Sequence, residues 1–238
     1  MRLLLMSLLI TACGIVVGEE CIGDCEESVP AKELQYLQKV TVKFPADVIV
    51  STGDKNTYSI VGASRAIREM SIRFQGGNLT FSKKWYRFRP PLIDNVAIYI
   101  TAKNLAAIHC EGRVAVSFQN FVGDKLWLQG SGRTVVTGSL TLQELNASFS
   151  GYVGAHLKGR VHVQEVSING AGSYDASAMV TESMHINVEG DAIAQVAVTE
   201  LLHASVSGKA SLIYSGKPKD LQTSISGQGK IETQSTPQ

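Results

Sequence analysis

The sequence predicts an all-β protein, folded as a right-handed parallel β-helix (solenoid) of about seven coils with ~19 residues each. The first observation behind this prediction is a glycine that recurs at nearly constant spacing. The second is that apolar residues take every second position before it, in one fixed order that coils stacked in parallel require. The glycines are Gly112, Gly132, Gly151, Gly172, Gly190, Gly208 and Gly227, with spacings of 20, 19, 21, 18, 18 and 19 residues.

The chain of 238 residues opens with a targeting segment over residues 1–18. Arg2 precedes the apolar stretch LLLMSLLITA, and residues 10–13 resemble a bacterial lipobox that ends at Cys13. Three alternatives remain open: lipidation of Cys13, simple secretion with cleavage after Gly18, and a retained cytoplasmic N-terminus. We expect the first, which predicts lipidation at Cys13 and an exported lipoprotein anchored to a bacterial envelope membrane, in the periplasm or on the cell surface.

Residues 19–35 are expected to form a flexible tether, because they are acidic and show no period. Cys21 and Cys25 lie in this tether, and whether they form a disulfide is left open. Residues 36–234 are expected to form a single β-solenoid domain. The net charge of +1 and the 18% of charged residues argue against nucleic acid as a partner.

In the first part of this domain, residues 37–100, the sequence predicts less regular β coils or a hairpin. Runs such as QKVTVKF and VAIYITA alternate in polarity, as strands with one buried face do. Gly76-Gly77 separates two alternating runs, which predicts a hairpin turn there.

Within the repeats, the positions six, four and two before each glycine are expected to face inward. Cys110 belongs to one of these columns and is expected to be a buried small hydrophobe. Three residues before each glycine stands a polar column that is expected to face outward. Its members are His109, Gln129, Ser148, Asn169, Asn187, Ser205 and Ser224.

The order of these features resembles that of a known bacterial family. The likeness rests on VTVKFPADVIV (40–50), GGNLTF (76–81), Gly130-Ser131-Gly132, Ser207-Gly208-Lys209-Ala210, SLIYSGKP (211–218) and Ser226-Gly227-Gln228-Gly229. Over roughly residues 38–232 the chain is similar to the putative auto-transporter adhesin, head GIN domain family. The resemblance implies a β-helical solenoid of the cell envelope with a role in adhesion, and it brings no catalytic residues. The chain departs from the usual Ser-Gly at Glu111-Gly112 and Glu189-Gly190.

The sequence holds few candidates for catalytic or metal-binding residues, and each can also be explained by a structural role. Polysaccharide-active β-helices need several carboxylates close together, but Asp175 and Asp191 fall in different columns, so no catalytic residues are expected. His185 and His203 occupy neighbouring coils about 5 Å apart, which suits either a metal site or a polar ladder. We expect the ladder, and therefore neither a metal nor a cofactor.

One basic aromatic cluster is the candidate binding surface. It comprises Lys84, Trp85, Tyr86, Arg87 and Arg89. Stacking and cation–π contacts from such residues suit a glycan, an anionic lipid surface or a protein ligand. The alternative is an amphipathic strand with its aromatic side chains packed down. The expected function is a non-enzymatic envelope solenoid for adhesion, binding or scaffolding. The alternative is a protein that binds or acts on envelope polysaccharide. End-to-end self-association through strand edges is a further expectation.

Overall fold

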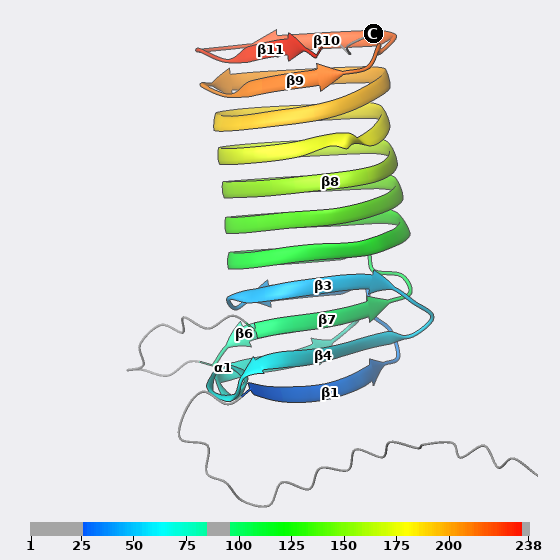
Figure 1. Ribbon diagram of the computed structural model, residues 1–238, viewed down its shortest axis with the longest axis vertical. Coiled ribbons are helices and arrows are strands. Elements are labelled where there is room, and N and C mark those ends of the chain that lie inside the picture. The colour runs from blue at the N-terminus through cyan, green and yellow to red at the C-terminus, as the bar shows by residue number, and fades with distance from the viewer. Residues whose placement is uncertain (1–25, 85–95, 235–238) are drawn as a thin grey trace, which may run out of the picture.

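The computed structural model describes residues 26–84 and 96–234, which are almost wholly β-strand (Figure 1). The strands are β1 (Glu26–Leu34), β2 (Lys39–Lys43), β3 (Ala46–Thr52), β4 (Asn56–Ala63), β5 (Met70–Gln75), β6 (Asn78–Lys83), β7 (Val96–Ala102), β8 (Ala107–Gly208), β9 (Ser211–Ser215), β10 (Asp220–Ile225) and β11 (Lys230–Thr233). One short helix, α1 (Ser64–Glu69), follows β4. The all-β prediction is confirmed.

The strands form one unclosed sheet that mixes parallel and antiparallel pairs. The long strand β8 winds back over itself, so that its successive turns lie one above another (Figure 1). Its first part pairs in parallel with β2 and β3, and its last part pairs in parallel with β9 and β10. The antiparallel pairs β1–β4, β4–β7 and β5–β6 lie in the N-terminal part.

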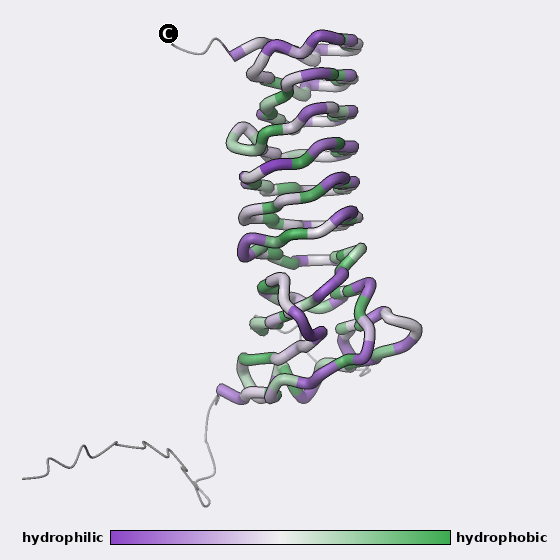
Figure 2. The backbone as a smooth tube through the Cα atoms, turned by 90° about the vertical axis from the view of Figure 1, so that its right-hand side faces the viewer, coloured by the Kyte–Doolittle hydropathy of each residue, from purple (hydrophilic) through white to green (hydrophobic). Residues whose placement is uncertain are grey.

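The alternation seen in the sequence is the reason that the chain winds around a core. Along each turn the hydropathy switches repeatedly between polar and apolar (Figure 2). Met184, Ile186 and Val188 are buried, whereas His185 and Asn187 between them are exposed. A strand sends successive side chains to opposite faces, so one face of each turn removes its apolar groups from water. These buried residues join into one cluster from β2 to β9, and it includes Cys110, as predicted.

Glycine is required at the corners by both backbone angle and space. Gly132 and Gly208 have φ of +92° and +78°, a region that side chains disfavour. A Cβ on Gly132 would stand 2.8 Å from the carbonyl oxygen of Gly112, the corner of the turn below. A Cβ on Gly208 would stand 2.8 Å from the carbonyl oxygen of Gly190. The corners therefore stack glycine on glycine.

In one coil the sequence alignment placed the corner at the wrong glycine. The corner that stacks on Gly151 is Gly170, and Gly190 stacks in turn on Gly170, whereas Gly172 lies against Val153. The corner spacings are therefore 20, 19, 19, 20, 18 and 19 residues. Two glycines stand two positions apart in this coil, and both have positive φ, so the sequence alone could not separate them. A shift of two leaves the faces unchanged, because the side-chain period is two.

The N-terminal part confirms one prediction and corrects another. Gly76 and Gly77, with φ of +56° and +75°, turn the hairpin between β5 and β6. The tether predicted for residues 19–35 is wrong for residues 26–34, because they form β1 and pair with β4. Exposed side chains conceal this strand in the sequence, since it binds through its backbone. Residues 19–25 lie outside the described residues. In the part of the chain that is described, no helix has the length and apolar character needed to cross a membrane.

Candidate functional site

Most of the binding surface predicted from the sequence falls outside the described residues. Trp85, Tyr86, Arg87 and Arg89 are not described, and neither are Cys13, Cys21 and Cys25, so these assignments stay predictions. Lys84 is described: its Nζ donates a hydrogen bond to the carbonyl oxygen of Arg68 at 2.8 Å. Its backbone N–H donates to the carbonyl oxygen of Glu69 at 2.8 Å. Lys84 thus joins the end of β6 to α1.

The structure offers a different surface, a groove along one outer face of β8 that extends onto β10. The groove consists of two adjoining hollows, of about 580 and about 400 Å³, that share Glu165 and Ser167. The smaller hollow begins at Trp127, and the larger one ends at Ser224. We call this surface the long groove. At one step of about 4.8 Å per turn, the distance from Trp127 to Gln222 is about 24 Å.

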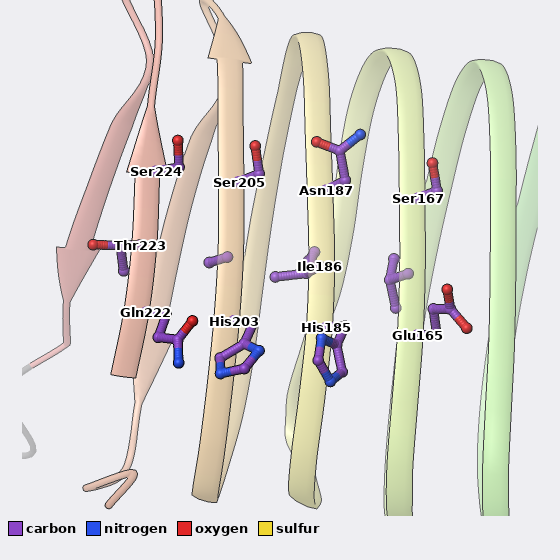
Figure 3. A pocket seen from close by; sticks show the side chains of 12 residues that line it. Glu165, Ser167, His185, Ile186, Asn187, His203, Ser205, Gln222, Thr223 and Ser224 are labelled. Carbon is purple, nitrogen blue, oxygen red and sulfur yellow. The ribbon is translucent and has the colours of Figure 1, made fainter. Parts of the chain in front are cut away.

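Two outward files of side chains border the long groove, and the corrected register aligns them. File A stands five residues before each corner and holds Trp127, Asn146, Glu165, His185, His203 and Gln222. File B stands three residues before each corner and holds Gln129, Ser148, Ser167, Asn187, Ser205 and Ser224. Figure 3 shows the larger hollow, where Glu165, His185, His203 and Gln222 form one row and the serines and Asn187 form the other. Ile186 and Ala204 lie between the rows.

The Trp127 end of the groove combines an exposed ring with fixed charges. The indole side chain is 52% exposed, and Lys125 Nζ lies 4.8 Å from its ring centroid. Lys125 also pairs with Glu144 at 2.6 Å, and Asn146 Nδ2 donates to Glu144 Oε1 at 2.6 Å. These hydrogen bonds, the one from Lys125 above all, hold the pKa of Glu144 below its ordinary value. The cation of Lys125 therefore lies over one face of a ring that stays about half exposed.

The predicted closeness of the two histidines is confirmed. The rings of His185 and His203 meet edge to face, with their centroids 4.7 Å apart. His203 Nε2 lies 3.5 Å from Asp220 Oδ2.

Two glutamates, each three residues before one of these histidines, have other partners. Glu182 pairs with His162 at 3.0 Å, and Glu200 pairs with Lys219 at 2.7 Å. Over residues 26–84 and 96–234, no three His, Cys, Asp or Glu side chains are grouped to hold a metal ion.

The chemistry that the groove offers is hydrogen bonding rather than acid–base catalysis. Its described lining includes hydroxyl, amide and imidazole groups and a single carboxylate, Glu165. Glycoside hydrolysis by the common mechanism needs two carboxylates across one bond. Asp175 lies elsewhere, and its partners are His156 at 3.0 Å and the hydroxyl of Ser177 at 2.6 Å. Burial tends to raise the pKa of Asp175, but hydrogen bonds from Ser177 and His156 outweigh this and lower it.

The outward polar column of File B was visible in the sequence, but the groove was not. The predicted column held Asn169 where the structure has Ser167, and nothing in it connected Trp127 with the histidines. The alignment depends on the corner that the structure identifies: once Gly170 is taken as the corner, Glu165, His185 and His203 fall in one file with Trp127. Concavity, however, depends on how the turns curve, which the repeat does not encode.

The fold is shared with several solved structures. A putative adhesin from Bacteroides fragilis is 21% identical, with a TM-score of 0.81 over 89% of this chain and 98% of that one. A putative adhesin from Parabacteroides merdae is 16% identical, with a TM-score of 0.61 over 88% and 96%. A putative lipid binding protein from Parabacteroides distasonis is also 16% identical, with a TM-score of 0.61 over 88% and 97%. At these identities the likeness concerns the fold alone. No curated protein matches the chain.

The family assignment rests on a direct match. The model of the family described as putative auto-transporter adhesin, head GIN domain, matches residues 37–218. This range runs from the residues before β2 to the end of β9 and beyond, and it includes almost the whole long groove. The match confirms the resemblance seen in the sequence: the chain belongs to the putative auto-transporter adhesin, head GIN domain family.

Proposed function

We propose that this protein is a non-enzymatic adhesin of the bacterial envelope that binds an extended glycan chain along the long groove. The family description points to an envelope or surface protein with an adhesive role. We further propose that the stacked turns form a right-handed parallel β-helix of about seven coils. Residues 36–234, together with β1, form one domain in this proposal. Lipidation at Cys13 anchors that domain to the membrane.

The observation that carries the ligand class is the composition of the two files. A sugar ring presents hydroxyl groups at its rim and an apolar patch on its face. Serine hydroxyls, asparagine and glutamine amides and imidazoles can each donate or accept hydrogen bonds, so they suit a rim of hydroxyls. The exposed indole of Trp127 suits the apolar face. Because the files repeat at every turn, the site fits a chain of repeating units better than a compact molecule.

A binding assay on immobilised envelope polysaccharides tests the proposal. Replacing Trp127 by Ala should weaken binding about tenfold or more, since covering an aromatic ring contributes about 1.5 kcal/mol or more. The matched control is Tyr152→Ala. Tyr152 is 47% exposed and lies near a cation, with Arg133 at 5.1 Å from its ring, but it stands after the corner and outside the groove. Equal losses in both variants would contradict the proposal.

Two further arms address the alternatives. The pair Trp85→Ala and Arg87→Ala in the same assay tests the cluster predicted from the sequence; if only this pair abolishes binding, the ligand lies there and not in the groove. Incubation of purified protein with the bound polysaccharide tests for activity. Shortened products would overturn the non-enzymatic part of the proposal and favour a polysaccharide-active protein.

The anchor has its own test. Cells that express the protein are fed a clickable palmitate analogue, and labelling is compared between the wild-type chain and Cys13→Ser. Labelling that survives the substitution would rule out Cys13 as the lipid site.

A further inference from the structure

The two ends of the stacked turns differ in how they treat their free strand edges. In its N-terminal part the sheet ends in two edge strands: β5, which pairs with β6, and β1, which pairs with β4. Strand β1 contains Pro30, its register shifts between Val29 and Lys32, and most of its side chains are exposed. Proline, a bulge and charged side chains are the devices by which edge strands avoid pairing with other chains. The β1 edge is therefore protected.

The opposite end has no such protection. Strand β10 pairs with β8 on one side, and all six of its residues are exposed. Leu221 and Ile225 stack above Leu202 and Val206, so they continue two inward files of the core. They are nevertheless 45% and 52% exposed. The apolar interior thus reaches the end of the described chain without a cover (Figure 1).

The backbone of β10 is oriented to accept a further strand. The N–H of Ser226 donates to the carbonyl oxygen of Val206, toward β8. Because backbone groups alternate in direction along a strand, those of Leu221, Thr223 and Ile225 point away from β8. Three residues thus offer donors and acceptors at the free edge, from the same positions that carry the exposed aliphatic side chains.

We propose that this edge pairs with the same edge of a second copy of the chain, antiparallel and about a twofold axis at Thr223. In this register Leu221 faces the partner's Ile225, and Thr223 faces its own counterpart. Gln222 faces the partner's Ser224, so no like charges meet. About six backbone hydrogen bonds form across the axis. The strand is complementary to itself, which is the condition for a closed twofold contact.

The second terminal strand fits the same symmetry. Strand β11 pairs with β9 on one side, and Ile231 stands at its centre. Antiparallel pairing about Ile231 sets Lys230 opposite the partner's Glu232, so opposite charges meet at both ends of the contact. Head-to-tail stacking would instead place β10 against β1, with its proline and bulge. The charge pairing on β11 and the protected edge of β1 therefore both favour a contact between the C-terminal ends of two copies.

This inference deepens the proposed function and, in one respect, rests on it. Gln222 and Ser224 are the last members of Files A and B, and a twofold axis across β10 places the partner's files in line with them. The long groove then continues into the second copy, for a total length of about 50 Å at one step per turn. A glycan chain long enough to cross the axis would contact both copies.

Cysteine cross-linking of the full chain in the cell envelope tests the contact directly. In Thr223→Cys the two introduced thiols lie in a hydrogen-bonded antiparallel pair, with Cα atoms about 5.5 Å apart, which a disulfide can span. We expect a reducible species of twice the mass of the mature protein. The control is Ile193→Cys, an equally exposed position (49%) on β8 away from the end. It should give no such species.

A second variant separates pairing from chance collision. Ile225→Lys in the Thr223→Cys background places a charge opposite the partner's Leu221 and should reduce the cross-linked fraction at least fivefold. Cross-linking of Thr223→Cys no stronger than in the control, or to a species of a different mass, would overturn the proposal. Trp127→Ala should leave cross-linking unchanged, so loss of glycan binding and loss of dimer formation are distinguishable.

Discussion

Gln164 is the least expected residue in the core, and its replacement gives a quantitative test of the fold. In the corrected register it stands six residues before Gly170, in the inward file that holds Leu145 and Met184. It is fully buried, at 0% exposure. Its Nε2 donates to the sulfur of Met179 at 2.6 Å, but its Oε1 has no hydrogen-bond partner among the described residues.

Replacing Gln164 by Met should therefore stabilise the protein. A buried acceptor without a partner costs about 1–3 kcal/mol, whereas the bond to a weak thioether acceptor contributes little. Methionine keeps nearly the same length and removes both polar groups. We expect the free energy of unfolding to rise by about 1–2 kcal/mol, which raises Tm by about 2–8 °C in a domain of this size.

Urea unfolding followed by circular dichroism measures this change, with an unchanged slope m showing that the surface exposed on unfolding is the same. Gln143→Met on the exposed side of β8 is the control, and it should stay within about 0.5 kcal/mol of wild type. A loss of stability in Gln164→Met would show that Oε1 is satisfied inside the core, and the burial argument would then be wrong.

Three other outcomes follow from the same structure. Gly208→Ala should lower the free energy of unfolding by at least about 1–2 kcal/mol, because φ is +78° there and the new Cβ would stand 2.8 Å from the carbonyl oxygen of Gly190. Gly154→Ala places its Cβ no closer than 3.7 Å to its nearest neighbour and should be neutral or slightly stabilising. Equal effects of the two substitutions in urea unfolding would contradict this. The Cys110 thiol, whose pKa burial raises to about 12, should resist iodoacetamide until the protein unfolds, as site-resolved mass spectrometry can check. Because Lys125 lowers the pKa of Glu144 in the folded state, that carboxylate contributes stability above the unfolded pKa of about 4.3 and loses it as pH falls through the lower folded value. The drop in Tm between pH 6 and pH 3 should accordingly be smaller in Lys125→Met than in wild type.

The repeat made most of the fold predictable. Gly132 and Gly208 mark corners in the sequence because only glycine tolerates their backbone angles, and Cys110 is buried as its column required. What the sequence could not resolve has physical causes. Two glycines in one coil gave equivalent alignments, so Gly172 was preferred over Gly170. Strand β1 escaped prediction because only Val29 and Leu34 of its side chains pack against the core, while its backbone pairs with β4.

The candidate site was less predictable than the fold. Its residue types were visible as an outward polar column, but a groove depends on curvature and on which files border one another. Trp127 is 20 residues from Ala107, its counterpart in the turn below, and 58 residues from His185, with which it shares the groove. Only the stacking of successive turns brings such distant segments onto one surface.

The repeated turns also allow the long groove to be lengthened by whole turns. Duplicating the 19 residues that separate Gly151 from Gly170 would add one member to every file without changing any face, and it would lengthen the surface by about 4.8 Å. Relatives could thereby match ligands of different length through tandem duplication alone. The length of the groove is thus set by the number of turns between its two ends.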